Sequence, residues 1–503
     1  MNPPPSASSS TPLERDARLV NARHGTIKPG EIAIGVIIGR TSEFFDFFVY
    51  ALASVLVFPS VVFPFVDPLT GTLYSFALFS LAFVGRPLGT LLFTAIDERH
   101  GRGVKLTIAL FLLGGSTMAI ALLPGHAQVG AVSAWLLAFF RLCQGIALGG
   151  TWDGLPSLLA LNAPKEYRGW YAMIPQIGAP LGLLVACALF AYFLALLNAD
   201  DFLTWGWRYP FFVALAINVV ALFARLRLVA TPDFQRLFES RELQPSPPFE
   251  TLFAEWRTIV LGAFAPLASF ALFHLVTVFP LSWVQLNTQQ EPVRFLVIEA
   301  VGAVICILAI LASGFIADRV GRRAVLGVSA ALIGAYSGFA PQLLGAGELG
   351  EIVFMFAGFV LLGLAFGQSS GAVNNSFSPY HRYTGAAIVS NSAWFIGAGF
   401  APLVALFLAS RLGLWSVGLY LLSGVICTLA ALAINREWAK RESCATEPGS
   451  TQRGTWSTTD IRLNGADAAF WAQKKPALRR ALVGCGGRIY ALRAWSPRLH
   501  RSG

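Results

Sequence analysis

Two carboxylates lie in a stretch that is otherwise apolar enough to cross a membrane. Glu43 and Asp46 belong to the run Gly39 to Tyr50, inside the longer segment Ile32 to Phe58. At about 1.5 Å per helical residue, both would lie well inside a hydrocarbon core about 30 Å thick. They are three residues apart, so they share one helix face. Because burial and mutual repulsion favour the protonated form, we predict that Asp46 and Glu43 carry a proton. A structural ion pair to a neighbouring helix is the alternative.

A basic residue, Arg141, lies near the middle of the predicted fourth span, too deep for its side chain to reach the membrane surface easily. Its guanidinium could pair with Asp46 or Glu43, or bind a substrate carboxylate through two hydrogen bonds. Protonation of its acidic partner would free it, which would link the binding of a proton to the binding of an anion. A permanent salt bridge is the other interpretation.

Further polar side chains in the predicted spans have a functional and a structural interpretation. Arg86 either lines a cavity or anchors the inner gate. Tyr50 and Gln144 are further candidates for holding a polar substrate. Asn374 and Asn391 could do the same or only join helices by hydrogen bonds. His274 and Glu299 interrupt the seventh and eighth spans. A lone histidine in an apolar run is more often a packing residue. Asp153 could pair with a basic loop residue.

The composition predicts an all-α polytopic membrane protein. The chain has 503 residues, of which 55% are hydrophobic and only 13% charged, whereas soluble domains are about one quarter charged. Twelve apolar stretches of spanning length recur from Ile32 to about Asn435. Basic residues are concentrated in alternate loops, which predicts a multi-pass protein of the cell (inner) membrane with both termini cytoplasmic. No signal peptide is expected.

The remaining composition argues against several function classes. The net charge of +10 lies largely in short loops and in the C-terminal tail, so it gives no case for nucleic-acid binding. The six cysteines have no spacing that suggests a metal site or a disulfide framework. Because no nucleophile elbow or nucleotide-binding loop is present, we expect neither an enzyme nor a bound cofactor. The expected partners are a small molecule, protons and the lipid bilayer.

Two repeated motifs divide the chain into halves. Asp97 to Arg102 after the second span is echoed by Asp318 to Arg323 after the eighth, and Gly178 to Leu181 by Phe400 to Leu403. Repeated halves usually hold a substrate between them, near the membrane midplane. The predicted domains are a cytoplasmic segment 1–31, a six-helix bundle 32–229, a cytoplasmic linker 230–255, a second six-helix bundle 256–435 and a cytoplasmic basic tail 436–503, expected to be disordered.

On these residues the chain resembles the major facilitator superfamily, and within it the metabolite:proton symporters. The first span matches the family pattern at Gly39, Glu43, Asp46 and Phe47, and departs from it at Arg40 and Phe44. The similarity continues in Phe83-x-x-Arg86-Pro87-x-Gly89, Arg141-x-x-Gln144-Gly145-x-x-x-Gly149-Gly150, Trp205-Gly206-Trp207-Arg208-x-Pro210-Phe211 and Tyr380-x-Arg382-Tyr383-Thr384-Gly385. It covers about residues 32–435.

The resemblance implies twelve helices in two six-helix bundles that rock about a central site. It also implies transport of a small, often carboxylate-bearing metabolite coupled to protons, by a monomer. The loop signature is intact from Gly314 to Arg323, whereas its first copy, from Thr94 to Lys105, has one residue inserted. The implied gate residues are Asp97, Arg102, Asp318, Arg319 and Arg322. Thr151 stands where the family usually has Glu.

The sequence leaves other functions open. A uniporter, or an antiporter that exports metabolites, would use the same fold. A membrane sensor that does not transport could also reuse it, with residues 436–503 as its output.

Overall fold

The computed structural model describes residues 29–151, 159, 163, 167–229, 245–370, 377–378 and 380–445. This part of the chain is helical and contains no β-strand. Within it, eleven segments are long and apolar enough to cross a membrane. Helix α2 (Pro29–Leu56), with 28 residues, is also long enough but carries Arg40, Glu43 and Asp46. The predicted all-α transmembrane fold class is confirmed.

The helices of the first half pack around α2. They are α2, α3 (Phe58–Val61), α4 (Pro68–His100), α5 (Arg102–Ala121), α6 (His126–Val129), α7 (Val132–Gly150), α9 (Arg168–Met173), η2 (Ile174–Ile177), α10 (Gly178–Leu196), α11 (Ala199–Thr204), η3 (Gly206–Arg208) and α12 (Tyr209–Val229). Helix α2 contacts α10 and α12, and α4 lies against α7 along much of its length. The carboxylate of Asp67 accepts a hydrogen bond from the Thr70 amide (3.0 Å), which caps α4 and holds the pKa of Asp67 below its usual value.

The second half repeats this arrangement. It comprises α14 (Pro248–Ala254), α15 (Trp256–Phe264), α16 (Leu267–Thr277), α17 (Phe279–Asn287), α18 (Pro292–Val320), α19 (Arg322–Leu343), α20 (Glu348–Phe366), α21 (Arg382–Ala393), η5 (Trp394–Ala398), α22 (Ala401–Leu412) and α23 (Trp415–Ala445). Helix α20 packs against α18, α19 and α16, and α15 packs against α21.

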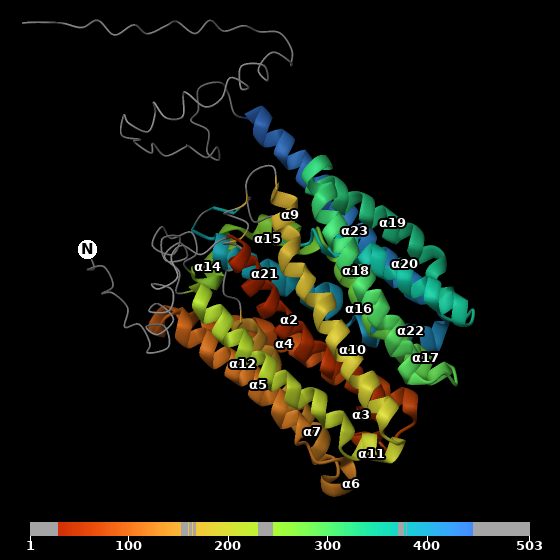
Figure 1. Ribbon diagram of the computed structural model, residues 1–503. Coiled ribbons are helices and arrows are strands. Elements are labelled where there is room, and N and C mark those ends of the chain that lie inside the picture. The colour runs from red at the N-terminus through yellow and green to blue at the C-terminus, as the bar shows by residue number, and fades with distance from the viewer. Residues whose placement is uncertain are drawn as a thin grey trace, which may run out of the picture. The chain divides into compact units, whose positions relative to one another are not determined.

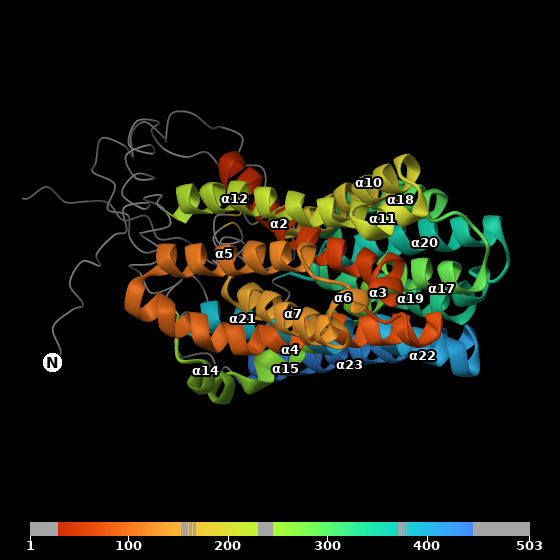
Figure 2. The same ribbon diagram turned by 90° about the horizontal axis from the view of Figure 1, so that it is seen from below.

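The halves meet along two pairs of helices. Helices α9 and α10 lie against α18, and α4 contacts α21 and α22. Both ribbon views place α10 beside α18 (Figures 1 and 2). In the most apolar stretch of the segment α15–α17, 89% is buried, so this segment lies deep among its neighbours rather than facing lipid.

The echoed sequence motif forms the same turn twice. Asp97 and Asp318 lie in the last turns of α4 and α18, so they are helical rather than loop residues as the sequence suggested. Only Gly101 and Gly321 separate each helix from the next. Their φ angles of 83° and 88° are in the region that favours glycine, which explains why both copies of the motif have glycine here.

Three of the spans are interrupted helices. In the fifth span, η2 separates α9 from α10 at Pro175, and in the seventh, Pro266 precedes α16. In the eleventh, the π-helical turn η5 separates α21 from α22, which begins just before Pro402. Proline has no amide hydrogen to continue the helical ladder, and such breaks are typical of helices that line a site. They would be hard to read from hydropathy alone.

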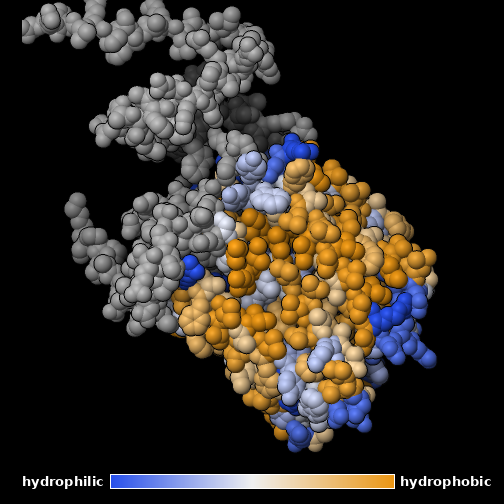
Figure 3. Space-filling view, viewed as in Figure 1, coloured by the Kyte–Doolittle hydropathy of each residue, from blue (hydrophilic) through white to orange (hydrophobic). Residues whose placement is uncertain are grey.

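The outer surface of the helices is strongly apolar. Large side chains with more than half of their surface exposed occur on several helices. They include Phe111, Phe139, Phe223, Leu308, Phe315 and Phe339. Figure 3 shows a broad hydrophobic region across the middle of the helices, with hydrophilic residues towards their ends. So large an apolar surface is what a bilayer covers.

The chain forms two compact units. Met1–Ala439 contains both halves, and Lys440–Gly503 is the second unit. Most of the predicted linker, residues 230–244, lies outside the described residues. Its end is ordered: α14 is helical, and Ser246 exchanges hydrogen bonds with Thr384 of α21 (2.8 and 3.0 Å). The predicted domain boundaries remain predictions.

Candidate functional site

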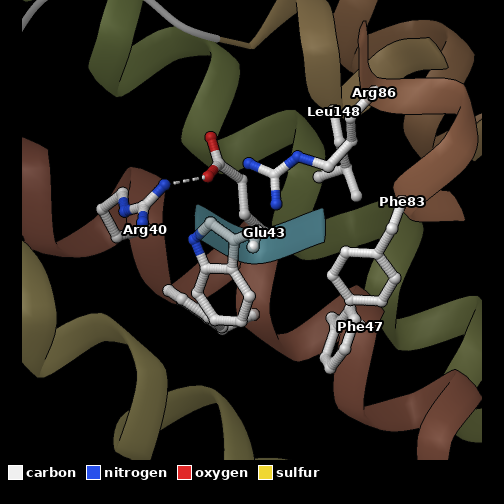
Figure 4. Close-up of a pocket in the computed structure, with 8 residues that line it drawn as sticks. Arg40, Glu43, Phe47, Phe83, Arg86 and Leu148 are labelled. Carbon is white, nitrogen blue, oxygen red and sulfur yellow. Dashed lines mark hydrogen bonds and ion pairs between the residues drawn. The ribbon is translucent and has the colours of Figure 1, made fainter. Parts of the chain in front are cut away.

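A pocket between the two halves contains the carboxylate of Glu43. Its walls come from α2, α4 and α7 of the first half and from η5 of the second. The lining residues are Arg40, Glu43, Phe44, Phe47, Phe83, Arg86, Leu148 and Trp394 (Figure 4). The space left for the centres of water-sized molecules is about 20 Å³. That volume holds a water molecule but no metabolite, so the structure represents a closed form of the site.

Glu43 is held by two arginines. Its Oε2 accepts from Arg40 Nη1 (2.7 Å), as Figure 4 shows, and its Oε1 accepts from Arg225 Nη2 (2.5 Å). Arg225 lies on α12 with 2% of its surface exposed and also donates to the Thr151 carbonyl (2.8 Å). A Cβ on Gly39 would meet the Arg225 guanidinium, so the glycine leaves room for Arg225 to reach Glu43.

Asp46 forms no ion pair in the described residues, and its hydrogen-bond partner is neutral. Its Oδ2 accepts from Asn218 Nδ2, and Asn218 Oδ1 in turn accepts from Ser42 (2.7 Å). Its Oδ1 has no hydrogen-bond partner among the described residues, and only 2% of Asp46 is exposed. A buried carboxylate with one unpartnered oxygen and no ion pair in this part of the chain is stabilised by a proton.

Arg141 pairs with neither acid, contrary to the first of the two arrangements expected from the sequence. Its Nη1 donates to Gln144 Oε1 (2.9 Å), its Nε donates to the Phe79 carbonyl (3.1 Å), and its guanidinium carbon lies 3.9 Å from the centre of the Tyr50 ring. Its Nη2 and the Tyr50 hydroxyl have no partner among the described residues. The structure therefore brings Arg141, Gln144 and Tyr50 together, with two donors still available.

Arg86 lies over the indole of Trp394, at 5.8 Å from the ring centre. It forms no ion pair within the described part of the chain, and its Nε has no partner there. Trp394 is surrounded by rings from both halves. Centroid distances are 5.6 Å to Phe44, 4.8 Å to Phe270 and 5.1 Å to Phe273. An arginine at the edge of an aromatic enclosure can bind a carboxylate whose apolar body contacts the rings.

Two of the other predicted residues have structural contacts. Asn391 donates to Thr90 of the other half (2.6 Å), which corresponds to the interhelical alternative. His274 is fully buried and stacks on Phe47 with centroids 5.1 Å apart. Asn374 and Asp153 lie outside the described residues.

The first predicted gate forms a charged cluster that reaches the other half. Asp97 pairs with Lys105 (2.8 Å) and Arg102 (3.5 Å). Lys105 Nζ also donates to the Tyr383 hydroxyl of α21 (3.0 Å), and the Arg102 guanidinium lies 4.6 Å from the Tyr383 ring centre. The sequence predicted Asp97 and Arg102 but not Lys105 or Tyr383.

The second gate caps a helix of the opposite half. Asp318 accepts hydrogen bonds from the amides of Gly169 (2.6 Å) and Trp170 (3.3 Å) at the start of α9. Arg322 donates to the carbonyls of Gln368 (3.2 Å) and Ser370. Arg319 lies over Phe315 of its own helix at 4.0 Å. Asp318 therefore joins the halves directly, whereas Arg322 holds its own half and Arg319 lies beside its own helix.

The sequence interpretation missed Arg225, Asn218 and Trp394. Asn218 and Arg225 are seven residues apart on α12, so they share one helix face, and this spacing was a usable signal. Trp394 gave none, because its position depends on the π-helical turn that it begins.

Comparison with known proteins identifies relatives over most of the chain. Residues 32–245 match the family described as "Sugar (and other) transporter". The inner membrane metabolite transport protein YhjE of Escherichia coli (strain K12) is 35% identical over 432 residues, which cover 84% of this chain and 96% of that protein. The shikimate transporter of the same strain is 30% identical and covers 83% and 97%, and its proline/betaine transporter is 26% identical and covers 82% and 85%.

Solved structures agree on the fold. The proton:xylose symporter XylE superposes with a TM-score of 0.61 over 82% of this chain and 95% of that chain, at 17% sequence identity. A partially occluded, inward-open form of the E. coli xylose transporter superposes with a TM-score of 0.59, at 16% identity.

Proposed function

This chain belongs to the metabolite transporters of the major facilitator superfamily, and we propose that it is a symporter that couples uptake of a small organic anion or zwitterion to protons. As a member of this family it is a multi-pass membrane transporter rather than an enzyme. The proposal places it in the cell inner membrane with both termini cytoplasmic, acting as a monomer by alternating access.

The pocket supports a carboxylate substrate. Glu43 is matched by Arg40 and Arg225, which leaves the Arg86 guanidinium as an anion-binding group beside Trp394. Shikimate, proline and betaine, which appear in the names of two of these relatives, all carry a carboxylate. In our proposal, the substrate carboxylate binds Arg86, and its apolar body contacts Phe44, Phe83 and Trp394. Arg141 and Tyr50 provide further donors deeper in the first half.

Asp46 is the proposed proton carrier, in preference to Glu43. Glu43 has two arginine partners, so it is stabilised as an anion, whereas Asp46 has amide and hydroxyl neighbours and one unpartnered oxygen. A group that is neutral in the closed form and ionises when water reaches it can accept a proton on one side and release it on the other. Asp46 and the proposed substrate contact Phe44 both lie on α2, so protonation and substrate binding act on the same helix.

The observation that carries the proposal is the Arg86 guanidinium, without an ion pair in the described residues, at an aromatic pocket shared by both halves. Uptake by proteoliposomes under an imposed pH gradient tests it, with labelled shikimate, betaine and proline as the first panel. We expect accumulation only when the outside is more acidic than the inside. Uptake that is independent of the gradient would indicate a uniporter, and efflux driven by the gradient would indicate an antiporter.

A further inference from the structure

Glu299 is a buried acid that the proposed transport cycle leaves unused. It lies on α18 with no exposed surface. Neither carboxyl oxygen has a hydrogen-bond partner among the described residues, and no ion pair forms there. An ionised carboxylate with no partner is strongly disfavoured in an apolar interior. In this closed form Glu299 is therefore protonated.

The groups around Glu299 in the described residues offer a negative charge no cation and at most one weak thiol donor. The titratable side chain that faces it is Cys187 of α10, which is also fully buried. On the other helices that pack against α18, charged groups lie at the ends. The acids of α20, Glu348 and Glu351, lie in its first turn, where Glu348 pairs with Arg294 (2.8 Å). The arginines of α19 and α9 lie at the opposite end of α18, near Asp318.

Glu299 also lies at the weaker end of a contact between the halves. It is about 10 Å along α18 from the first residue, Pro292, and Cys187 is about 14 Å along α10 from the last residue, Leu196. Both of these helix ends are on the side predicted to face outwards. At the other end, Asp318 accepts hydrogen bonds from the start of α9. Within the described chain, the hydrogen bonds between the halves lie towards that inner end. The outer end can therefore separate without breaking any of these bonds.

We propose that Glu299 is a proton-operated lock on the outer gate, which closes against α10 only when the carboxyl carries a proton taken from the external solution. The inference rests on the alternating-access transport proposed above. When the outer ends of α10 and α18 part, water reaches Glu299 and it can ionise. The ionised side chain then opposes closure, because closing would bury a charge between two apolar helix faces. The proton returns to external water when the lock opens, so the lock is separate from the transported proton on Asp46.

The sign of the pH effect follows from proton counting. The closed form holds one proton more than the ionised open form, so a rise in external pH favours the open form. Above the pH at which the exposed carboxyl ionises, the ratio of open to closed molecules rises about tenfold per pH unit. With Gln at this position neither form gains or loses a proton, and this dependence disappears.

Cys187 provides a direct reporter of the opening. We would keep it as the only cysteine, express the protein in right-side-out membrane vesicles without substrate, and clamp the internal pH. A membrane-impermeant maleimide is then applied between about pH 5.5 and 7.5. Thiolate formation alone gives a slope of about one for the logarithm of the labelling rate against pH. The lock adds a second proton, so we expect a slope of about two for the native glutamate and about one for Glu299→Gln.

Matched variants decide the interpretation. Glu348→Gln, which removes an acid from the same predicted outer end, is expected to keep the slope near two. A slope near one with Glu299 in place would overturn the lock, as would a Cys187 that is never labelled at any pH. These two results need no Gln variant, so they decide even if Glu299→Gln fails to reach the membrane. Because no substrate is present, the outcome is independent of whether uptake is proton-coupled.

Discussion

At the scale of single residues, the structure separates two acids that the sequence could not rank. Glu43 and Asp46 share a helix face, but Glu43 lies between Arg40 and Arg225, while Asp46 has Asn218 on one oxygen and nothing in the described residues on the other. A carboxylate between two guanidinium groups is held as an anion. The neighbours on α12, rather than depth in the membrane, therefore distinguish the two roles.

Replacing Asp46 by Asn tests its proposed role. The amide is nearly isosteric but cannot bind and release a proton, so we expect concentrative uptake to fall to the equilibrium level of about one while substrate exchange continues. Uptake under a pH gradient and counterflow without one should be measured in the same proteoliposomes. Glu348→Gln is the control, since Glu348 is a surface acid whose pair with Arg294 contributes little. Normal accumulation by Asp46→Asn would clear Asp46 of the proton role.

Replacing Arg86 tests the anion-binding position. Loss of a charge-assisted hydrogen bond costs about 1.5–3 kcal/mol, so Arg86→Gln should weaken binding of a carboxylate substrate by about 10- to 150-fold. Arg86→Lys keeps the charge but not the planar fork, so its substrate affinity should lie between those of the native protein and Arg86→Gln. Binding can be followed by quenching of tryptophan fluorescence, because Trp394 lies beside the guanidinium. Arg411→Gln, at the exposed end of α22, serves as the control. Unchanged affinity in Arg86→Gln would exclude a direct contact.

At the scale of elements, α4 and α7 are positioned by glycines that allow their backbones to touch. A Cβ on Gly149 would collide with the backbone of Arg86 and Thr90, and a Cβ on Gly85 would come within 2.9 Å of the Leu142 carbonyl. Backbone atoms cannot move aside as a flexible side chain can. This close contact fixes the distance between Arg86 on α4 and Arg141 on α7.

We therefore expect Gly149→Ala to push the two helices apart. Overpacking of this kind costs about 1–3 kcal/mol, which should appear as a lower melting temperature in detergent together with weaker substrate binding. Gly115→Ala on α5 is the matched control, because a Cβ there meets nothing within 4 Å. Helix propensity alone favours Ala by up to about 1 kcal/mol, so this control should be neutral or slightly stabilising. A Gly149→Ala protein as stable as the control would contradict the packing argument.

Much of this arrangement could be predicted from the sequence, for identifiable reasons. Hydropathy and the echo of Asp97 by Asp318 indicated the helices and their division into halves, because both are local patterns. Arg225, the partner of Glu43 on α12, was missed because an arginine that ends an apolar run looks like a loop residue, and only its seven-residue spacing from Asn218 pointed to a shared helix face. The same holds for Trp394, because no simple sequence pattern marks a π-helical turn.

At the scale of the whole molecule, the polar contacts that the described residues make between the halves lie towards one end. Lys105 reaches Tyr383 at one side, and Asp318 caps α9 at the other. These contacts close the side that is predicted to face the cytoplasm, while the pocket is too small for a metabolite. Transport requires that these contacts break in one state and re-form in another, so their strength sets how often each side opens.

Asp318→Asn should shift this balance towards the inward-open form. Three hydrogen bonds from the amides of Gly169 and Trp170 converge on its charged oxygens. The positive end of the α9 dipole also stabilises the negative charge of this carboxylate. Replacing it with a neutral amide should cost the closed form about 1–2 kcal/mol, which is a 5- to 30-fold change in population. Distances between spin labels on the inner ends of α9 and α18 would measure the change.

Arg319→Gln is the closest control: it alters the next residue of the same motif, but Arg319 lies over Phe315 of its own helix, so the distance distribution should stay unchanged. Equal shifts in both variants would mean that any change at this end of α18, rather than loss of the cap on α9, opens the inner side.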